Sequence, residues 1–206
     1  MDNNLNNLEM AKKRNHKIMI TDEAINKIPR IKYRDIPENE YDNLWDLAKN
    51  VLKISKEENN SNEVAITYSL DNAKLIEQGE RYIGVALGGE HNVDPLSDTT
   101  AYHLVSSVKK CVVIVLHNHP SLSDFSLTDV QFLLKYDNIK MMVVITNLGS
   151  ISYLVKGGKY DLEKAIALFN EAVDKNNKAE KLKDLQNAAI YFLKNSCNAG
   201  IYYDNR

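Results

Sequence analysis

A short apolar run that leads directly into two histidines constrains this chain more than any other feature. Residues 111–116 read Cys-Val-Val-Ile-Val-Leu, and this β-branched run favours a buried strand over a helix. His117 and His119 follow it, and side chains two residues apart point to the same face of a strand. Pro120 lacks a backbone N–H and restricts the residue before it, so the chain turns there. We therefore expect both imidazoles to converge at the C-terminal end of this strand.

A carboxylate follows in the first turn of the next expected helix. Ser126-Leu127-Thr128-Asp129 has the pattern of a helix start, with Ser126 as the N-cap and Asp129 favoured by the helix dipole. Such a cap would also hold Asp129 still. A single histidine is more often an ordinary polar residue than a ligand, and the combination is what indicates a metal site. Two histidines and one aspartate, with a fourth position open, form a ligand set suited to catalytic zinc.

These residues resemble the motif of the JAMM metalloprotease family, also called JAB or MPN, and in particular its RadC-like bacterial branch. The family pattern is a glutamate on an early strand, then His-x-His-Pro, then Ser-x-x-Asp. It corresponds here to Glu63, residues 117–120 and residues 126–129. The loop between the second histidine and the serine has six residues, one fewer than is usual in the family. The resemblance spans about residues 63–156.

The resemblance implies a zinc-dependent metallohydrolase that cleaves a peptide or isopeptide amide bond in a protein or peptide substrate. It implies a Zn²⁺ ion bound by His117, His119 and Asp129. It further implies Glu63 as the general base and Ser126 as a hydrogen-bond donor to the oxyanion. Without the histidines, Glu63 would be interpreted as an exposed charge at a strand edge. The same resemblance allows an alternative, a non-catalytic or nucleic-acid-associated RadC-like module.

Composition narrows the classes of function. The formal net charge of −2 offers no general basic excess for tracking phosphates, so nucleic-acid binding is disfavoured. No apolar stretch approaches the length of a membrane span, and polar residues interrupt the N-terminal region, so we expect neither a membrane segment nor a signal peptide. Cys111 and Cys197 do not make a disulfide framework. These features together predict a cytoplasmic protein.

The remaining sequence patterns predict an α/β fold. Further strands are expected over residues 63–68, 82–87, 140–146 and 150–155, and around 74–77 as a hairpin partner of the first. Helices are expected from Thr21, from Pro37, over 97–109 and from Ser126, with a loop over 55–62. The result is a mixed, largely hairpin-connected sheet flanked by helices, and the resemblance implies a JAB/MPN-like, cytidine-deaminase-like architecture.

We expect three parts along the chain: an N-terminal helical extension over residues 1–55, a JAMM/JAB-like catalytic domain over 63–156 and a C-terminal helical extension over 160–196. The last part carries two apolar stripes. The polar stretch 174–178 between them is either a loop or an interval within one long helix. The stripes suit packing on the sheet, on the N-terminal helix or on a second copy of the chain, so a homo-oligomer through the terminal helices stays an open alternative.

Overall fold

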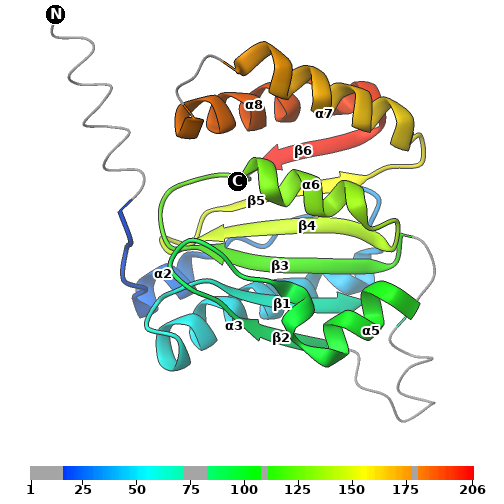
Figure 1. Ribbon diagram of the computed structural model, residues 1–206. Coiled ribbons are helices and arrows are strands. Elements are labelled where there is room, and N and C mark those ends of the chain that lie inside the picture. Colours follow the sequence, from blue (N-terminus) through cyan, green and yellow to red (C-terminus); the bar gives the residue numbers. More distant parts are fainter. Residues whose placement is uncertain (1–15, 72–82, 108–110, 178–180) are drawn as a thin grey trace, which may run out of the picture.

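The computed structural model describes residues 16–71, 83–107, 111–177 and 181–206, which form one mixed sheet with helices on both faces (Figure 1). Its strands are β1 (Val64–Ser69), β2 (Ile83–Leu87), β3 (Val113–His119), β4 (Ile139–Thr146), β5 (Ile151–Lys156) and β6 (Ile201–Asn205). They lie in the order β2-β1-β3-β4-β5-β6. The central pair β3 and β4 runs parallel, and the other four neighbouring pairs are antiparallel.

Helices cover this sheet from two sides. The α-helices are α2 (Asp22–Lys27), α3 (Tyr41–Glu58), α5 (Thr99–Ser107), α6 (Leu127–Lys135), α7 (Leu162–Asn176) and α8 (Lys181–Asn195). Short 3-10 turns are η1 (Glu38–Glu40), η2 (Pro95–Ser97) and η3 (Ser196–Ala199). In Figure 1, α2 and α3 lie behind the sheet, α5 and α6 lie in front of it, and α7 and α8 lie near β6.

Two apolar layers join the helices to the sheet, one on each face. Alternate residues of β3 belong to opposite layers: Ile114 and Leu116 pack with α3, whereas Val113 and Val115 pack with α5 to α8. Every residue of β3 is buried, as expected for a strand covered on both sides. His117 continues the series of Val113 and Val115, so the histidines lie on the α6 face of the sheet.

The predicted α/β class and mixed sheet are confirmed. The expected strands appear as β1, β2, β4 and β5, and the strand that carries the histidines appears as β3. The helices expected from Thr21 and Ser126 are also present, as α2 and α6. The expected strand around residues 74–77 lies outside the described residues.

The loop predicted over residues 55–62 is wrong in its first half, because α3 continues through Glu58. Lys56, Glu57 and Glu58 are good helix formers, and this preference outweighs the polar composition of the stretch. Ser55 is buried inside this last turn, where its hydroxyl donates to the carbonyl oxygen of Asn62 at 2.5 Å. The true loop is therefore a tight turn that leads directly to Glu63.

The C-terminal region contains one element beyond the predicted helices. After α8 and η3, Gly200 adopts a left-handed conformation with φ of 72°, and β6 then pairs antiparallel with β5. Residues 174–176, expected to lie in a polar stretch between two helices, belong to α7, which continues to Asn176; residues 178–180 lie outside the described residues. The sheet thus gains an edge strand from the far end of the sequence.

Within the described ranges, every helix is too short or too polar to cross a membrane. Both cysteines are free thiols; Cys111 is half-buried and Cys197 is exposed.

Candidate metal centre

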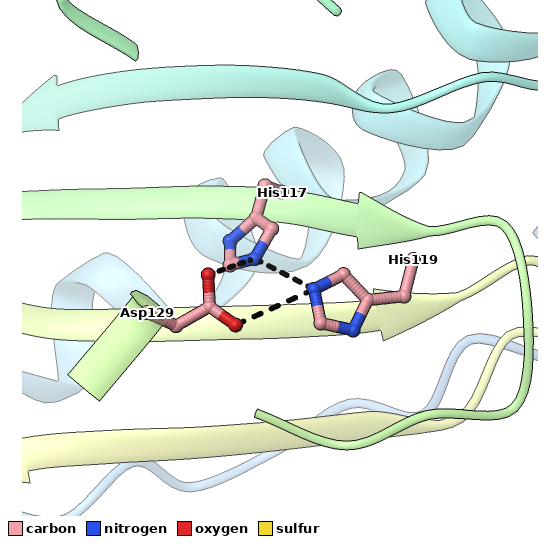
Figure 2. A group of neighbouring side chains, drawn as sticks. All are labelled: His117, His119 and Asp129. Atoms are coloured by element: carbon pink, nitrogen blue, oxygen red, sulfur yellow. Dashed lines mark hydrogen bonds and ion pairs between the residues drawn. The ribbon is translucent and has the colours of Figure 1, made fainter. Parts of the chain in front are cut away.

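His117, His119 and Asp129 come together where β3 ends and α6 begins (Figure 2). His117 Nε2 lies 3.1 Å from His119 Nε2 and 3.2 Å from Asp129 Oδ1. His119 Nε2 lies 3.5 Å from Asp129 Oδ2. Both histidines are buried, and the Asp129 side chain keeps 16% of its surface exposed. The group is therefore largely shielded from solvent, and Asp129 is its most exposed member.

The spacing of the side-chain ligand atoms of these three residues is compatible with a small metal ion. Tetrahedral coordination at metal–ligand distances of about 2.0 to 2.1 Å places neighbouring ligand atoms about 3.3 to 3.4 Å apart. The two imidazole nitrogens are 3.1 Å apart, and the Asp129 carboxylate approaches them with different oxygens, Oδ1 at 3.2 Å from His117 and Oδ2 at 3.5 Å from His119. Two imidazole nitrogens and one carboxylate oxygen also leave a fourth position open. One ligand atom from each residue lies within 4.8 Å of the others, so this group could hold a metal ion.

Without a metal, the same atoms form a hydrogen-bonded ion pair. Burial alone would lower the pKa of His119, but the hydrogen bond and negative charge of Asp129 raise this pKa to about 9. Burial alone would raise the pKa of the Asp129 carboxyl, but the charge of His117 and the hydrogen bonds from both imidazoles hold it well below its usual value. A proton on His119 and a metal ion therefore compete for the same place.

Ser126 holds Asp129 at the start of α6. Ser126 Oγ accepts a hydrogen bond from the Asp129 N–H at 3.2 Å, and Asp129 Oδ2 accepts one from the Ser126 N–H at 2.7 Å, which makes a capping box. Ser126 Oγ also lies 2.7 Å from Asp129 Oδ2 and donates its proton there. The predicted cap is confirmed. The Ser126 hydroxyl proton is directed at Asp129, so its expected role as an oxyanion donor stays a prediction.

The orientation of the His119 ring is set from its other nitrogen. His119 Nδ1 lies 3.1 Å from the carbonyl oxygen of Ser123 and 3.2 Å from Ser123 Oγ. A proton on Nδ1 is donated to this carbonyl oxygen, which leaves the Nε2 lone pair directed at the ligand group. Metal-binding histidines commonly have such a partner, because it fixes both tautomer and ring orientation.

Glu63 lies on the same face of the sheet as the two histidines. In the antiparallel pair of β1 and β3, Ala65 stands opposite His117. Extending this register by two residues would bring Glu63 opposite His119, and the carboxyl of Glu63 is close enough for the imidazoles of His119 and His117 to influence its pKa. Only 7% of Glu63 is exposed. The glutamate expected from the sequence is thus beside the ligand group.

Hydrogen bonds fix the backbone of Glu63, and burial shifts the pKa of its carboxyl. The Glu63 N–H donates to Gly89 O at 2.9 Å, and Glu63 O accepts from Gly88 N–H at 2.8 Å and from Asn59 Nδ2 at 2.8 Å. Burial raises the pKa of the Glu63 carboxyl above its ordinary value, although the imidazoles of His119 and His117 oppose this effect. A buried carboxyl with a raised pKa is suited to taking up and returning a proton.

Asn118 supports the ligand strand from the opposite face. Its Oδ1 accepts a hydrogen bond from the Val64 N–H at 2.8 Å. Its Nδ2 donates to Asn147 Oδ1 at 2.8 Å, and to Ser55 Oγ and Asn62 O at 3.2 Å each. The alternation of β3 predicts that this side chain points away from the histidines, and its contacts agree. Its partners come from distant parts of the sequence, which no spacing within the motif indicates.

Asn147 extends this network to the turn after β3. The Asn147 N–H donates to His119 O at 3.1 Å, and Asn147 Nδ2 donates to Ile18 O at 2.7 Å and Ser61 O at 3.0 Å. The Ile18 N–H in turn donates to Pro120 O at 2.7 Å. The N-terminal segment around Ile18 is therefore attached directly to the chain that carries the ligands.

No protein-family model matches the sequence, and comparisons with curated proteins and with solved structures find no match either. The interpretation of this centre therefore depends on its own geometry. The structure brings His117, His119 and Asp129 into one group, as expected, and places Ser126 against Asp129 and Glu63 on the same face.

Proposed function

We propose that the protein is a zinc-dependent metallohydrolase of the JAMM type that cleaves a peptide or isopeptide amide bond. The observation that carries this proposal is the convergence of two imidazole nitrogens, 3.1 Å apart, and the Asp129 carboxylate, whose two oxygens lie 3.2 and 3.5 Å from them, at the junction of β3 and α6. The six-residue loop between His119 and Ser126 closes this group although it is one residue shorter than usual in that family.

The proposed metal is zinc because of the donor set. Three protein ligands that include imidazole nitrogens, with one open position, are typical of catalytic zinc, whereas magnesium and calcium prefer oxygen ligands. A zinc ion held by His117, His119 and Asp129 would supply a Lewis acid and would lower the pKa of water to about 7.

Glu63 is proposed as the group that moves protons. It takes a proton from the attacking water as the new C–O bond forms, and gives a proton to the amide nitrogen as the C–N bond breaks. Two features support this role: Glu63 lies on the ligand face opposite His119, and burial raises the pKa of its carboxyl.

We propose two alternative roles for the Ser126 hydroxyl. Its single proton can serve only one of them at a time. Its hydroxyl donates to Asp129 Oδ2 in the structure, which fixes that ligand. Turned toward substrate, the same hydroxyl would donate to the developing oxyanion, a contact worth about 100- to 1,000-fold in rate in other enzymes.

The proposal extends to the architecture, which we take to be JAB/MPN-like and cytidine-deaminase-like. The support is a mixed sheet covered on both faces, with the ligands at the C-terminal end of β3 and the third ligand on the helix that follows. The parallel pair β3 and β4 is joined through that helix, so α6 crosses the same face that carries the histidines.

The test combines metal content with hydrolysis. Purified protein loaded with zinc is incubated with a mixture of peptides that contain α-linked and lysine-ε-linked amide bonds, and products are detected by mass spectrometry. Glu63→Gln is compared with the parent, and Glu58→Gln, an exposed glutamate at the end of α3, is the matched control. Glu63→Gln should retain zinc and lose about 100- to 10,000-fold in hydrolysis rate.

Glu63 is not the base if Glu63→Gln hydrolyses as fast as the parent and the control. Absence of any metal-dependent hydrolysis, together with DNA binding that weakens steeply with added salt, would favour the nucleic-acid-associated alternative.

A further inference from the structure

The loop that connects the ligands His119 and Asp129 is fixed at its centre by the last strand of the sheet. Asp124 Oδ2 accepts hydrogen bonds from the Tyr203 hydroxyl and, at 3.3 Å, from Asn205 Nδ2. The other oxygen of Asp124 accepts from the Phe125 N–H at 2.8 Å. Tyr203 and Asp124 are 79 residues apart in sequence, so this contact is formed only in the folded sheet.

Apolar packing strengthens the same contact. The rings of Phe125 and Tyr203 meet edge to face, with centroids 6.5 Å apart and an interplanar angle of 77°. Phe125 is buried, and Tyr203 is held in β6 opposite Leu154 of β5. Burial and the hydrogen bond to Asp124 raise the pKa of Tyr203 to about 12, so the phenol remains a donor at neutral pH.

The residue next to Asp124 orients a metal ligand. The Ser123 carbonyl oxygen and hydroxyl both lie within hydrogen-bond distance of His119 Nδ1, at 3.1 and 3.2 Å. A displacement of Asp124 therefore moves the group that fixes the His119 ring. The other end of the loop is held separately, by the hydrogen bond from Ile18 N–H to Pro120 O at 2.7 Å.

We propose that Tyr203 is a positioning residue for the metal centre, acting through Asp124 and Ser123 on the orientation of His119. The proposal rests on the zinc site proposed above. It makes β6, which lies outside the segment that resembles the JAMM family, a functional part of the centre.

The test measures zinc affinity, which requires no substrate. Tyr203→Phe removes the hydroxyl and keeps the ring against Phe125. Tyr202→Phe is the matched control, because Tyr202 lies on the same strand but packs with the opposite apolar layer, beneath the Arg34 guanidinium. Dissociation constants are measured at neutral pH by competition with a chelator, and circular dichroism of each metal-free variant verifies that it is folded.

Tyr203→Phe should weaken zinc binding by about three- to tenfold, less than the roughly 10- to 100-fold typical of a residue that contacts a metal ligand directly. Tyr202→Phe should bind zinc like the parent. The visible spectrum of the cobalt-substituted protein should change for Tyr203→Phe and not for Tyr202→Phe, because only the first change alters the ligand geometry.

A double-mutant cycle separates positioning from a general loss of stability. If Tyr203 acts through Asp124, Tyr203→Phe adds no further weakening in an Asp124→Ala background. Parent-like zinc affinity in Tyr203→Phe, or an equal weakening in both backgrounds, overturns this inference and leaves the zinc site standing. A parent protein that binds no zinc overturns the site and the inference together.

Discussion

Replacing Asn118 with alanine tests the buried amide network that supports the metal centre from behind. The change removes the acceptor of the Val64 N–H and the donor to Asn147 Oδ1, both at 2.8 Å in a fully buried position. A buried polar group left without a partner costs about 1 to 3 kcal/mol, so two of them predict a loss of about 2 to 6 kcal/mol. Domains of this kind have about 5 to 15 kcal/mol of stability in total. The variant should therefore fold, with a large loss of stability.

Urea unfolding of the metal-free protein measures this loss as a lower midpoint at an unchanged slope. Asn50→Ala is the matched control, because Asn50 is exposed on α3 and alanine is the better helix former there. The control should keep or slightly gain stability. A loss below about 1 kcal/mol for Asn118→Ala, within the range of an ordinary exposed hydrogen bond, would refute the reasoning.

His119 and Ser126 give two further predictions for the metal-free protein. The folded pKa of His119, about 9, lies above its ordinary 6.5, so its contribution to stability is fully present below about pH 6.5 and is lost as the pH rises through about 9. Urea midpoints in the presence of chelator should fall over this interval, and His119→Gln should remove that fall; a parent midpoint that stays level would contradict the assignment. Ser126→Ala should cost about 1 kcal/mol through loss of the N-cap, whereas Ser126→Gly should cost only a few tenths. Equal unfolding midpoints for the parent and Ser126→Ala would mean that the cap is not stabilising.

The ligand group was predictable because its signals are local. The β-branched run before His117 indicates a strand, the two-residue spacing gives both imidazoles the same face, and Ser126-x-x-Asp129 indicates a helix start. Each signal lies within a few residues of the side chain that it places. The alternation of side chains along β3 likewise predicts that Asn118 points away from the histidines. It does not predict which residues Asn118 contacts.

The parts that were not predicted depend on contacts between distant segments. Strand β6 is five residues long and follows two helices, and its only local signals are the left-handed Gly200 and the β-forming pair Tyr202 and Tyr203. Its partner β5 lies across α7 and α8. The extension of α3 to Glu58 is hard to predict for another reason, because the helix-favouring Lys-Glu-Glu is followed directly by an Asn- and Ser-rich stretch that indicates a loop.

The zinc content of the folded protein tests whether His117, His119 and Asp129 hold a zinc ion, as proposed. Parent and variants are loaded with zinc, dialysed against a weak chelator and analysed by atomic emission. We expect about one zinc per chain for the parent, and almost none for Asp129→Ala. Asp174→Ala, an exposed carboxylate on α7, should retain zinc like the parent. A folded parent that retains no zinc, or an Asp129→Ala variant that retains as much as the parent, would show that these three residues do not form a zinc site.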